Sequence, residues 1–215
     1  MSERYVPAAG RAWLTPFYDA VTAAAMRQTK WRPLLVERAV GSTAAPRILD
    51  LGCGTGAMAL EIGRLHPHAR LVGIDGDPEM LRRASAKARA AGIALELYEA
   101  RAEQLPLADR SVDSVVSTLV LHHLSAASKR AALSEVRRVL VPGGSLLVAD
   151  PGRAQDPVMR MAFLAIQVLD GFSNTRENAR GRLPGVIAET GFSAVTVLGR
   201  YRTGAGTLEL IEARR

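Results

Sequence analysis

The feature that most constrains the fold is the run Ile48–Gly56, in which a short apolar segment leads directly into three glycines at alternate positions. An apolar run of this length, bounded by turn residues, predicts a buried strand. Glycines permit a tight turn and a close approach of the backbone to a ligand, and the helix that follows presents free amides. Asp50, just before the turn, can receive an ammonium group. We therefore expect a strand–turn–helix unit that binds a small polar ligand.

A repeated alternation of short apolar runs and helical patterns begins at Arg47. This alternation is typical of an α/β protein, in which helices cover both faces of a mostly parallel sheet. The seven expected strands are Arg47–Leu51, Arg70–Asp75, Ala94–Glu99, Val112–Leu119, Gly144–Asp150, Ala194–Leu198 and Thr207–Ala213. The helices expected between them are Gly56–His66, Pro78–Ala91, Ser128–Leu140 and Leu183–Thr190. The last two strands are expected to form a hairpin-like pair.

The 215 residues are interpreted as one domain, 1–215, with four parts. Residues 1–46 form a helical cap with helices at Phe17–Thr29 and Pro33–Val40, and residues 47–150 form the ligand-binding core. Residues 151–182 depart from the alternation as an insertion, in which an amphipathic stretch, Val158–Leu169, precedes a polar segment. This stretch packs in the core or forms a lid. Residues 183–215 supply the final helix and the strand pair.

A second anchor for a ligand is Asp75, which ends the apolar strand before it. It follows the glycines by about 20 residues, the usual distance to an acid that binds ribose hydroxyls. Two anchors at this spacing indicate a nucleotide-like ligand more strongly than either alone. The alternative is that Asp75 only caps the helix starting at Pro78, which Asp77 could do equally well.

Composition excludes several classes of protein. Cys53 is the only cysteine, which excludes an internal disulfide and a zinc site built on several thiolates, and fits a cytoplasmic protein. No signal-peptide pattern and no apolar run of roughly 18 residues is present, so neither export nor a transmembrane segment is expected. The net charge of +7 can attract nucleic acid, but the arginines are spread along helical patterns rather than clustered.

Four segments together resemble a known family: DLGCGTG, VGIDGDPEML, RAEQLPLADRSVDSVVS and RRVLVPGGSLLVAD. They are similar to the class I S-adenosylmethionine-dependent methyltransferases, in particular the group related to ubiquinone and menaquinone biosynthesis enzymes. The resemblance spans residues 14–150. It implies a Rossmann-like, doubly wound, seven-stranded sheet with an antiparallel last strand, and S-adenosylmethionine as the cofactor.

The resemblance also implies where the cofactor lies. The glycine turn lies under its methionine part, the acid after the second strand holds the ribose, and the loop after the third strand covers the adenine. The cofactor residues so implied are Asp50, Gly52, Cys53, Gly54, Gly56, Asp75, Gly76, Arg101, Ala102 and Ser117. One departure is Arg101, which stands where relatives commonly carry an acid, so the backbone of Ala102 is left as the adenine contact.

Two adjacent histidines, His122 and His123, follow the fourth strand, whose end should lie beside the transferable methyl group. Either can accept a proton from a substrate near neutral pH. The alternative is that one packs against the next helix. Because the leaving group is a charged sulfonium, alignment of the reactants supplies much of the rate, and a dedicated base is not required. No metal is expected, since no carboxylate cluster accompanies the histidines.

The methyl acceptor expected from the resemblance is a small or lipophilic molecule, such as a quinone precursor or a secondary metabolite. Its expected contacts come from the cap and the insertion: Trp13, Phe17, Tyr18, Phe163, Phe172 and Arg176. An RNA or protein methyltransferase is the alternative, although Ser117–Val120 lacks the Asn/Asp-Pro-Pro-aromatic pattern of base N-methylation. A nicotinamide-dependent oxidoreductase is a remote alternative, because Gly52, Gly54 and Ala57 satisfy a looser dinucleotide pattern. A cofactor-binding protein without turnover also stays open.

Overall fold

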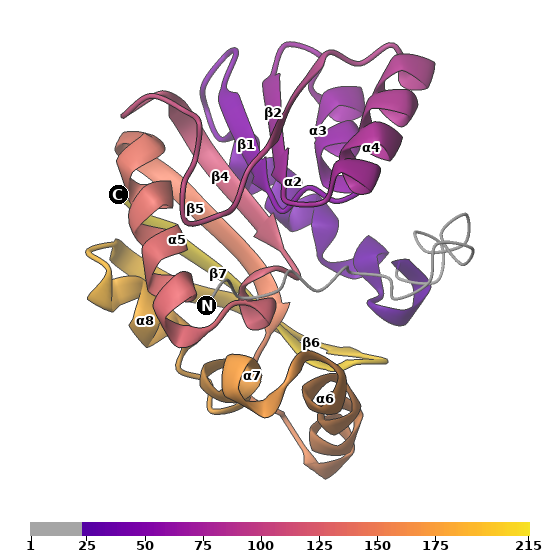
Figure 1. Cartoon of the computed structure of the whole chain (residues 1–215), viewed down its shortest axis with the longest axis vertical. Helices are drawn as coiled ribbons and strands as arrows, with labels where there is room; N and C mark the ends of the chain where they lie inside the picture. Colours follow the sequence, from indigo (N-terminus) through magenta and orange to yellow (C-terminus); the bar gives the residue numbers. More distant parts are fainter. Residues whose placement is uncertain (1–22) are drawn as a thin grey trace.

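A computed structural model describes residues 23–215, which are built around one seven-stranded sheet (Figure 1). The strands are β1 (Arg47–Leu51), β2 (Arg70–Asp75), β3 (Leu95–Glu99), β4 (Val112–Thr118), β5 (Leu140–Pro151), β6 (Ser193–Thr203) and β7 (Gly206–Arg214). Their order across the sheet is β3-β2-β1-β4-β5-β7-β6. The pairs from β3 to β5 are parallel, whereas β7 runs antiparallel to both β5 and β6. The predicted seven-stranded, mostly parallel sheet with an antiparallel last strand is confirmed.

Helices connect the strands in the predicted order. They are η2 (Gln28–Lys30), α2 (Arg32–Val40), α3 (Ala57–Leu65), α4 (Pro78–Ala91), η3 (Leu121–His123), α5 (Ala126–Val139), α6 (Pro157–Asp170), α7 (Phe172–Ala179) and α8 (Leu183–Glu189). Several helices begin at a polar cap, because the first amides of a helix have no partner inside it. Asp77, Ser125 and Asp156 each accept a backbone amide from the first turn of α4, α5 and α6.

Both faces of the sheet are buried, because successive side chains of a strand point to opposite sides. One core contains Leu49 and Val115 and is covered by α5 and α8. The other contains Ile48 and Val116 and is covered by α2 and α3. This explains why the central strands read as continuous apolar runs. Among the described residues, no helix is long and apolar enough to cross a membrane.

The structure differs from the sequence-based expectation in several places, and β6 runs over Ser193–Thr203 where only Ala194–Leu198 was expected. α7 forms where only a polar segment was expected, and its burial of Thr175 and Asn178 shows that tertiary contacts stabilise it. β5 begins at Leu140 rather than Gly144, since Leu140 already pairs with Val112 ahead of a register shift. In the cap, residues 23–25 are helical, but the positive φ of Arg27, 51°, ends that helix before Thr29.

Candidate functional site

The candidate site lies where β1 and β4 are neighbours in the middle of the sheet. The chain moves outward from β1 to β2 and β3, and then returns to β4 on the other side of β1. In open α/β sheets, such a reversal leaves a crevice at the carboxyl ends of the two strands, which is where ligands bind. The predicted glycine turn follows β1 at this point, and η3 with its two histidines follows β4.

The three glycines of the turn all have positive φ, but each is required for a different reason. Gly52 has φ 68°, and a Cβ there would collide with the side chain of Val120, just after β4. Gly56 has φ 77° and lies against α4, with Ala84 Cβ 3.1 Å from the position of a Cβ. Gly54 has φ 52° and open space around it. Only Gly54 therefore presents an unobstructed backbone to a ligand.

Asp75 holds this turn in place. The amides of Gly52 and Cys53 both donate to the carbonyl of Ile74, at 2.8 and 3.0 Å. The Gly54 amide then donates to Asp75 Oδ2 at 2.8 Å, and the Asp77 amide to Oδ1 at 2.9 Å. Burial raises the pKa of Asp75, and these amides partly oppose that effect. The helix cap is Asp77, which accepts from Glu79, so the alternative role of Asp75 as the cap of α4 is wrong.

Asp50 is the most deeply buried acid of the turn, with only 2% of its surface exposed. Its Oδ2 accepts the Ala59 amide in the first turn of α3 at 3.2 Å. Its Oδ1 is buried and has no hydrogen-bond partner in residues 23–215. Burial raises the pKa of Asp50 to about 7, while the positive charge of Arg32 acts in the opposite direction. A buried acceptor without a partner has an energetic cost that a ligand donor can remove.

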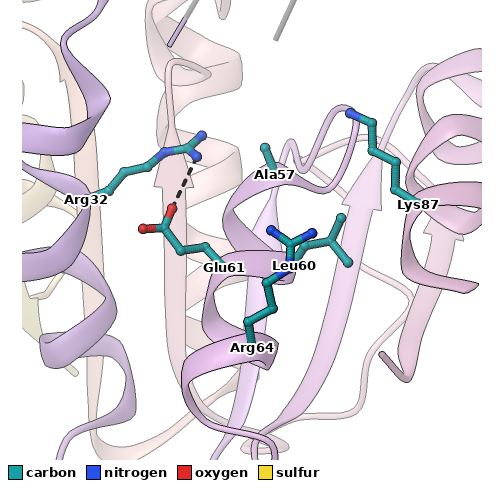
Figure 2. A pocket seen from close by; sticks show the side chains of 6 residues that line it. All are labelled: Arg32, Ala57, Leu60, Glu61, Arg64 and Lys87. Carbon is teal, nitrogen blue, oxygen red and sulfur yellow. Dashed lines mark hydrogen bonds and ion pairs between the residues drawn. The ribbon is translucent and has the colours of Figure 1, made fainter. Parts of the chain in front are cut away.

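Arg32, in the first turn of α2, is a residue that the sequence did not single out. Its guanidinium donates to Glu61 at 3.3 Å, but its buried Nε has no partner among the described residues. Figure 2 shows Arg32 and Glu61 at one wall of a hollow of about 440 Å³ beside α3. The hollow is also lined by Ala57, Leu60, Arg64 and Lys87. None of the predicted cofactor residues lines it, so it adjoins the turn without containing it.

The other predicted cofactor residues lie around the same strand ends. Cys53 is buried with its sulfur against Gly73 of β2, and burial raises the pKa of its thiol. This position favours a packing role for the side chain. The Gly76 amide lies close enough to Asp75 to lower the pKa of that carboxyl. Ser117 is buried beside Leu51, and its hydroxyl has no partner in the described part of the chain.

The predicted adenine loop follows β3, which lies beyond β2 at the edge of the sheet. The Arg101 side chain is largely exposed and pairs with Glu103 at 3.2 Å. Ala102 is partly buried against the core on the α5 side. The Ala100 amide donates to the carbonyl of Asp75 at 3.1 Å, which joins the start of this loop to the end of β2.

The two histidines of η3 have different surroundings. His122 is buried, and its Nδ1 lies 2.6 Å from Asp150 Oδ1 at the end of β5. The other oxygen of Asp150 accepts the Leu121 amide at 2.7 Å. His123 is exposed, with its ring centroid 4.0 Å from that of His122. Just before them, Leu119 has φ 60°, a strained conformation of the kind that clusters at functional sites.

Asp150 is therefore a site residue that sequence reasoning missed. It is fully buried, and besides His122 it contacts Asn178 Nδ2 of α7 at 3.5 Å. The available signal was its position at the carboxyl end of a strand beside β4, where functional residues of parallel sheets gather. Across residues 23–215, no group of three or more histidines, cysteines and acids is arranged to hold a metal ion.

The predicted acceptor residues are only partly brought together. Trp13, Phe17 and Tyr18 lie outside the described residues. Phe163 is buried against Gly206 of the β6–β7 hairpin, which favours the core alternative for this side chain. Phe172 and Arg176 are exposed and line a second hollow, of about 340 Å³, between α6 and α7.

Residues 48–144 match the protein family described as a methyltransferase domain. A ubiquinone/menaquinone biosynthesis C-methyltransferase of Syntrophotalea carbinolica is 36% identical over 130 residues, which are 60% of this chain and 54% of that protein. A demethylmenaquinone methyltransferase of Thermus thermophilus is 40% identical over 121 residues, which are 56% of this chain and 54% of that protein. The chain thus spans about half the length of these curated relatives.

Solved structures share the fold across a larger part of the chain. A SAM-dependent methyltransferase from Methanosarcina mazei has a TM-score of 0.68 at 23% identity, covering 85% of this chain and 97% of that one. The cyclase SpnF has a TM-score of 0.70 at 18% identity, covering 94% and 92%. Because a cyclase has the same fold, the fold alone does not define the reaction.

Proposed function

We propose that the chain transfers the methyl group of S-adenosylmethionine to a small, lipophilic acceptor, because residues 48–144 match the family described as a methyltransferase domain and the sheet has the architecture expected from the resemblance. The observation that carries this proposal is the glycine turn, in which Asp75 holds the Gly54 amide while the buried Oδ1 of Asp50 has no partner among residues 23–215. The turn thus combines an organised ribose-side acid with an unsatisfied acceptor.

The chemistry of the turn fits the methionine part of S-adenosylmethionine, which carries an ammonium and a carboxylate on one carbon. Asp50 Oδ1 is suited to accept from the ammonium, and the unpartnered Nε of Arg32 is suited to donate to the carboxylate. Arg32 also lies close enough to Asp50 to lower the pKa of that acid. Asp75 retains acceptor capacity for the ribose hydroxyls, since each carboxylate oxygen can accept more than one hydrogen bond.

When bound, the cofactor supplies an activated methyl group on a positively charged sulfur. The residues of the chain then align the acceptor and handle its proton. Asp150 contacts Nδ1 of His122 and so fixes the orientation of the ring. In the tautomer with the proton on Nδ1, Nε2 is the basic nitrogen. His122 is accordingly the preferred general base of the pair, and His123 is placed at the exposed side of the same turn.

The class of acceptor is proposed from the relatives, whose names refer to ubiquinone and menaquinone biosynthesis. A quinone precursor or a comparable lipophilic metabolite is favoured over RNA, because aromatic residues, on which RNA bases stack, make up only 5% of the chain. We also propose that residues 1–215 act as one domain in the cytoplasm. The single sheet of the described part and the lone cysteine support this proposal.

The test uses methyl-tritiated S-adenosylmethionine with an extract of the source cells, partitioned into organic, RNA and protein fractions. We expect label in the organic fraction, and we expect it to be lost in Asp75→Asn, which weakens both the turn and the ribose contact. Asp77→Asn is the matched control, because asparagine retains the helix cap. Label in RNA or protein would contradict the acceptor class, and cofactor binding without any label would contradict the enzymatic assignment.

A further inference from the structure

Helix α6 is apolar on two opposite faces. Met159, Phe163 and Gln167 occupy one face, at intervals of four residues, and are buried on the sheet side. The opposite face is open to solvent: Met161 is 66% exposed and Leu169 is 77% exposed. We call this second face the outer stripe; it consists of Val158, Met161, Ala165, Val168, Leu169 and Phe172 at the start of α7.

An outer stripe of this kind requires a partner. A helix that is apolar all round is normally covered on all sides, and contiguous exposed apolar patches mark interaction sites. The other exposed helices of the described chain follow the usual rule; Leu65 on α3 is the one large exposed apolar residue of residues 23–215 outside this region. In Figure 1, α6 and α7 lie together at the end of the molecule away from α3 and α4.

Arginines surround the outer stripe. The hollow of about 340 Å³ between α6 and α7 is lined by Arg160, Arg176 and Arg180 together with Phe172. Arg160 donates to Gln167 at 2.6 Å, whereas Arg176 and Arg180 form no ion pair with any described residue. A cationic hollow thus opens beside an exposed aromatic ring.

Acidic residues do not neutralise this region. Residues 151–182 contain five arginines and three acids. Two of the acids are already engaged, since Asp156 caps α6 and pairs with Arg202, and Glu177 pairs with Arg130 and Lys129. Arg182 pairs with Glu189 at 3.6 Å, and the arginines that remain, including the exposed Arg153, leave the surface around the stripe positively charged.

We propose that α6 and α7 dock on the surface of an anionic phospholipid bilayer. The outer stripe enters the boundary between headgroups and acyl chains, and Arg160, Arg176 and Arg180 bind the phosphate groups. Amphipathic helices with an apolar face flanked by arginines bind such surfaces by these two contributions. A second copy of the chain is disfavoured as the partner, because it would bring the same positive charge to the contact.

The docking itself does not depend on methyl transfer, but it gives the proposed lipophilic acceptor a source. α7 contacts η3, and its Asn174 side chain donates to the carbonyl of His123 at 2.9 Å. A bilayer against α6 and α7 would therefore lie on the side of the molecule where α7 contacts η3 and its histidines.

The experiment is co-sedimentation of the full chain with two kinds of vesicle. One kind is phosphatidylcholine alone, and the other also contains about 30% phosphatidylglycerol, which gives the surface a negative potential. We expect at least tenfold stronger binding to the anionic vesicles. Arg176→Gln/Arg180→Gln should weaken that binding roughly thirtyfold, at ~1 kcal/mol for each of the two arginines. Met161→Gln/Val168→Gln/Leu169→Gln should weaken it at least as much.

Matched controls carry the same changes elsewhere: Arg70→Gln/Arg89→Gln on β2 and α4, and Leu65→Gln on α3, all at exposed positions. They should bind as the parent does, and circular dichroism should show every variant folded. Equal binding to both kinds of vesicle, or binding to neither, would overturn the proposal. So would complete competition by inorganic phosphate, or a dimer that the stripe variant dissociates. Because this experiment measures vesicle binding, its outcome does not depend on whether the methyl-transfer assay succeeds.

Discussion

The glycines of the turn differ in what they contact, although they look equivalent in the sequence. Gly52 is confined by Val120, whereas Gly54 has no atom near the position of a Cβ. Each lies at positive φ, where a side chain adds strain of roughly 1–2 kcal/mol. At Gly52 an added Cβ would also collide with Val120, which costs further energy. At Gly54 it would meet no atom, so only the backbone strain applies.

We therefore expect Gly52→Ala and Gly54→Ala to separate stability from cofactor binding. Gly52→Ala should lower the free energy of unfolding by more than the strain alone, roughly 2–4 kcal/mol, and Val120→Ala in the same chain should restore part of the loss. Gly54→Ala should cost only about 1–2 kcal/mol but should weaken cofactor binding at least tenfold. Urea unfolding and calorimetric titration measure the two effects; equal losses of stability would argue against the contact assigned to Gly52.

Asp50 and Asp75 show how position decides the chemistry of two acids in one turn. Asp75 accepts two backbone amides, and Asp50 accepts one and keeps an unpartnered oxygen in the described chain. Burial raises the pKa of both, and for Asp50 to about 7. Below pH 7 the free protein therefore favours the neutral form of Asp50.

The pH dependence of stability follows from this shift. The pKa of an aspartate in the unfolded chain is about 4, so the stabilising contribution of neutral Asp50 is present below pH 4 and is lost as pH rises through 7. Relative to Asp50→Asn, the parent should lose on the order of 2–4 kcal/mol between pH 4 and pH 7. Urea unfolding of both proteins across this range measures the difference; parallel curves would contradict it.

Cofactor affinity should depend on pH in the opposite direction, because an ammonium group binds the ionised carboxylate. We expect the affinity for S-adenosylmethionine to fall up to about tenfold for each pH unit below 7. Asp50→Asn should bind weakly with little dependence on pH over the same range. A parent profile as flat as that of the variant would remove Asp50 from the cofactor site.

At the scale of elements, α7 is held by a buried polar network rather than by apolar packing. Lys129 of α5 is fully buried and donates to the Asn174 carbonyl at 3.1 Å and to Asn178 Oδ1 at 3.0 Å. Asn178 in turn donates to the Pro151 carbonyl at 2.8 Å. Burial lowers the pKa of Lys129, and the nearby Asp150 and Glu177 oppose this. The network connects α5, α7 and the end of β5.

Lys129→Met should therefore loosen α7 more than the rest of the molecule. Removal of the ammonium leaves Asn178 Oδ1 and the Asn174 carbonyl without this donor, at a cost of roughly 1–3 kcal/mol. Amide hydrogen exchange in Phe172–Ala179 should accelerate by about tenfold or more, while β1 and β4 retain their protection. Lys87→Met on α4 is the control. Uniform acceleration over the chain would indicate a general loss of stability instead.

At the scale of the whole molecule, the sheet places β1, β4 and β5 side by side, so that the turn, η3 and Asp150 meet at one edge. A ligand that binds only the folded form across these elements stabilises all of them together. Thermal unfolding therefore reports cofactor identity independently of turnover.

S-adenosylhomocysteine at about 100 times its dissociation constant should stabilise the fold by about 2.7 kcal/mol. For a chain of this size, that corresponds to a rise in Tm of roughly 5–10 °C. NADH at the same concentration should leave Tm unchanged, and Asp75→Asn should respond less than the parent. Stabilisation by NADH and not by S-adenosylhomocysteine would favour the oxidoreductase alternative.

Features that depend on near neighbours in the chain could be predicted from the sequence. The strand, the glycine turn and the helix after Ile48 could be predicted because apolar runs and glycine conformation are local properties. The two acids could be predicted because their distance along the chain is set by one βα unit. Strand number and sheet type followed from the repeated alternation.

Contacts between distant residues, in contrast, could not be predicted, because they depend on the folded structure. It brought Arg32 close to Asp50, paired His122 with Asp150, and enclosed Lys129 between α5 and α7. It also formed α7 from the polar segment after Gly171, since buried contacts outweigh a weak intrinsic tendency to form a helix. These contacts join residues far apart in the chain, and their energies depend on burial and orientation, which arise only when the sheet is assembled.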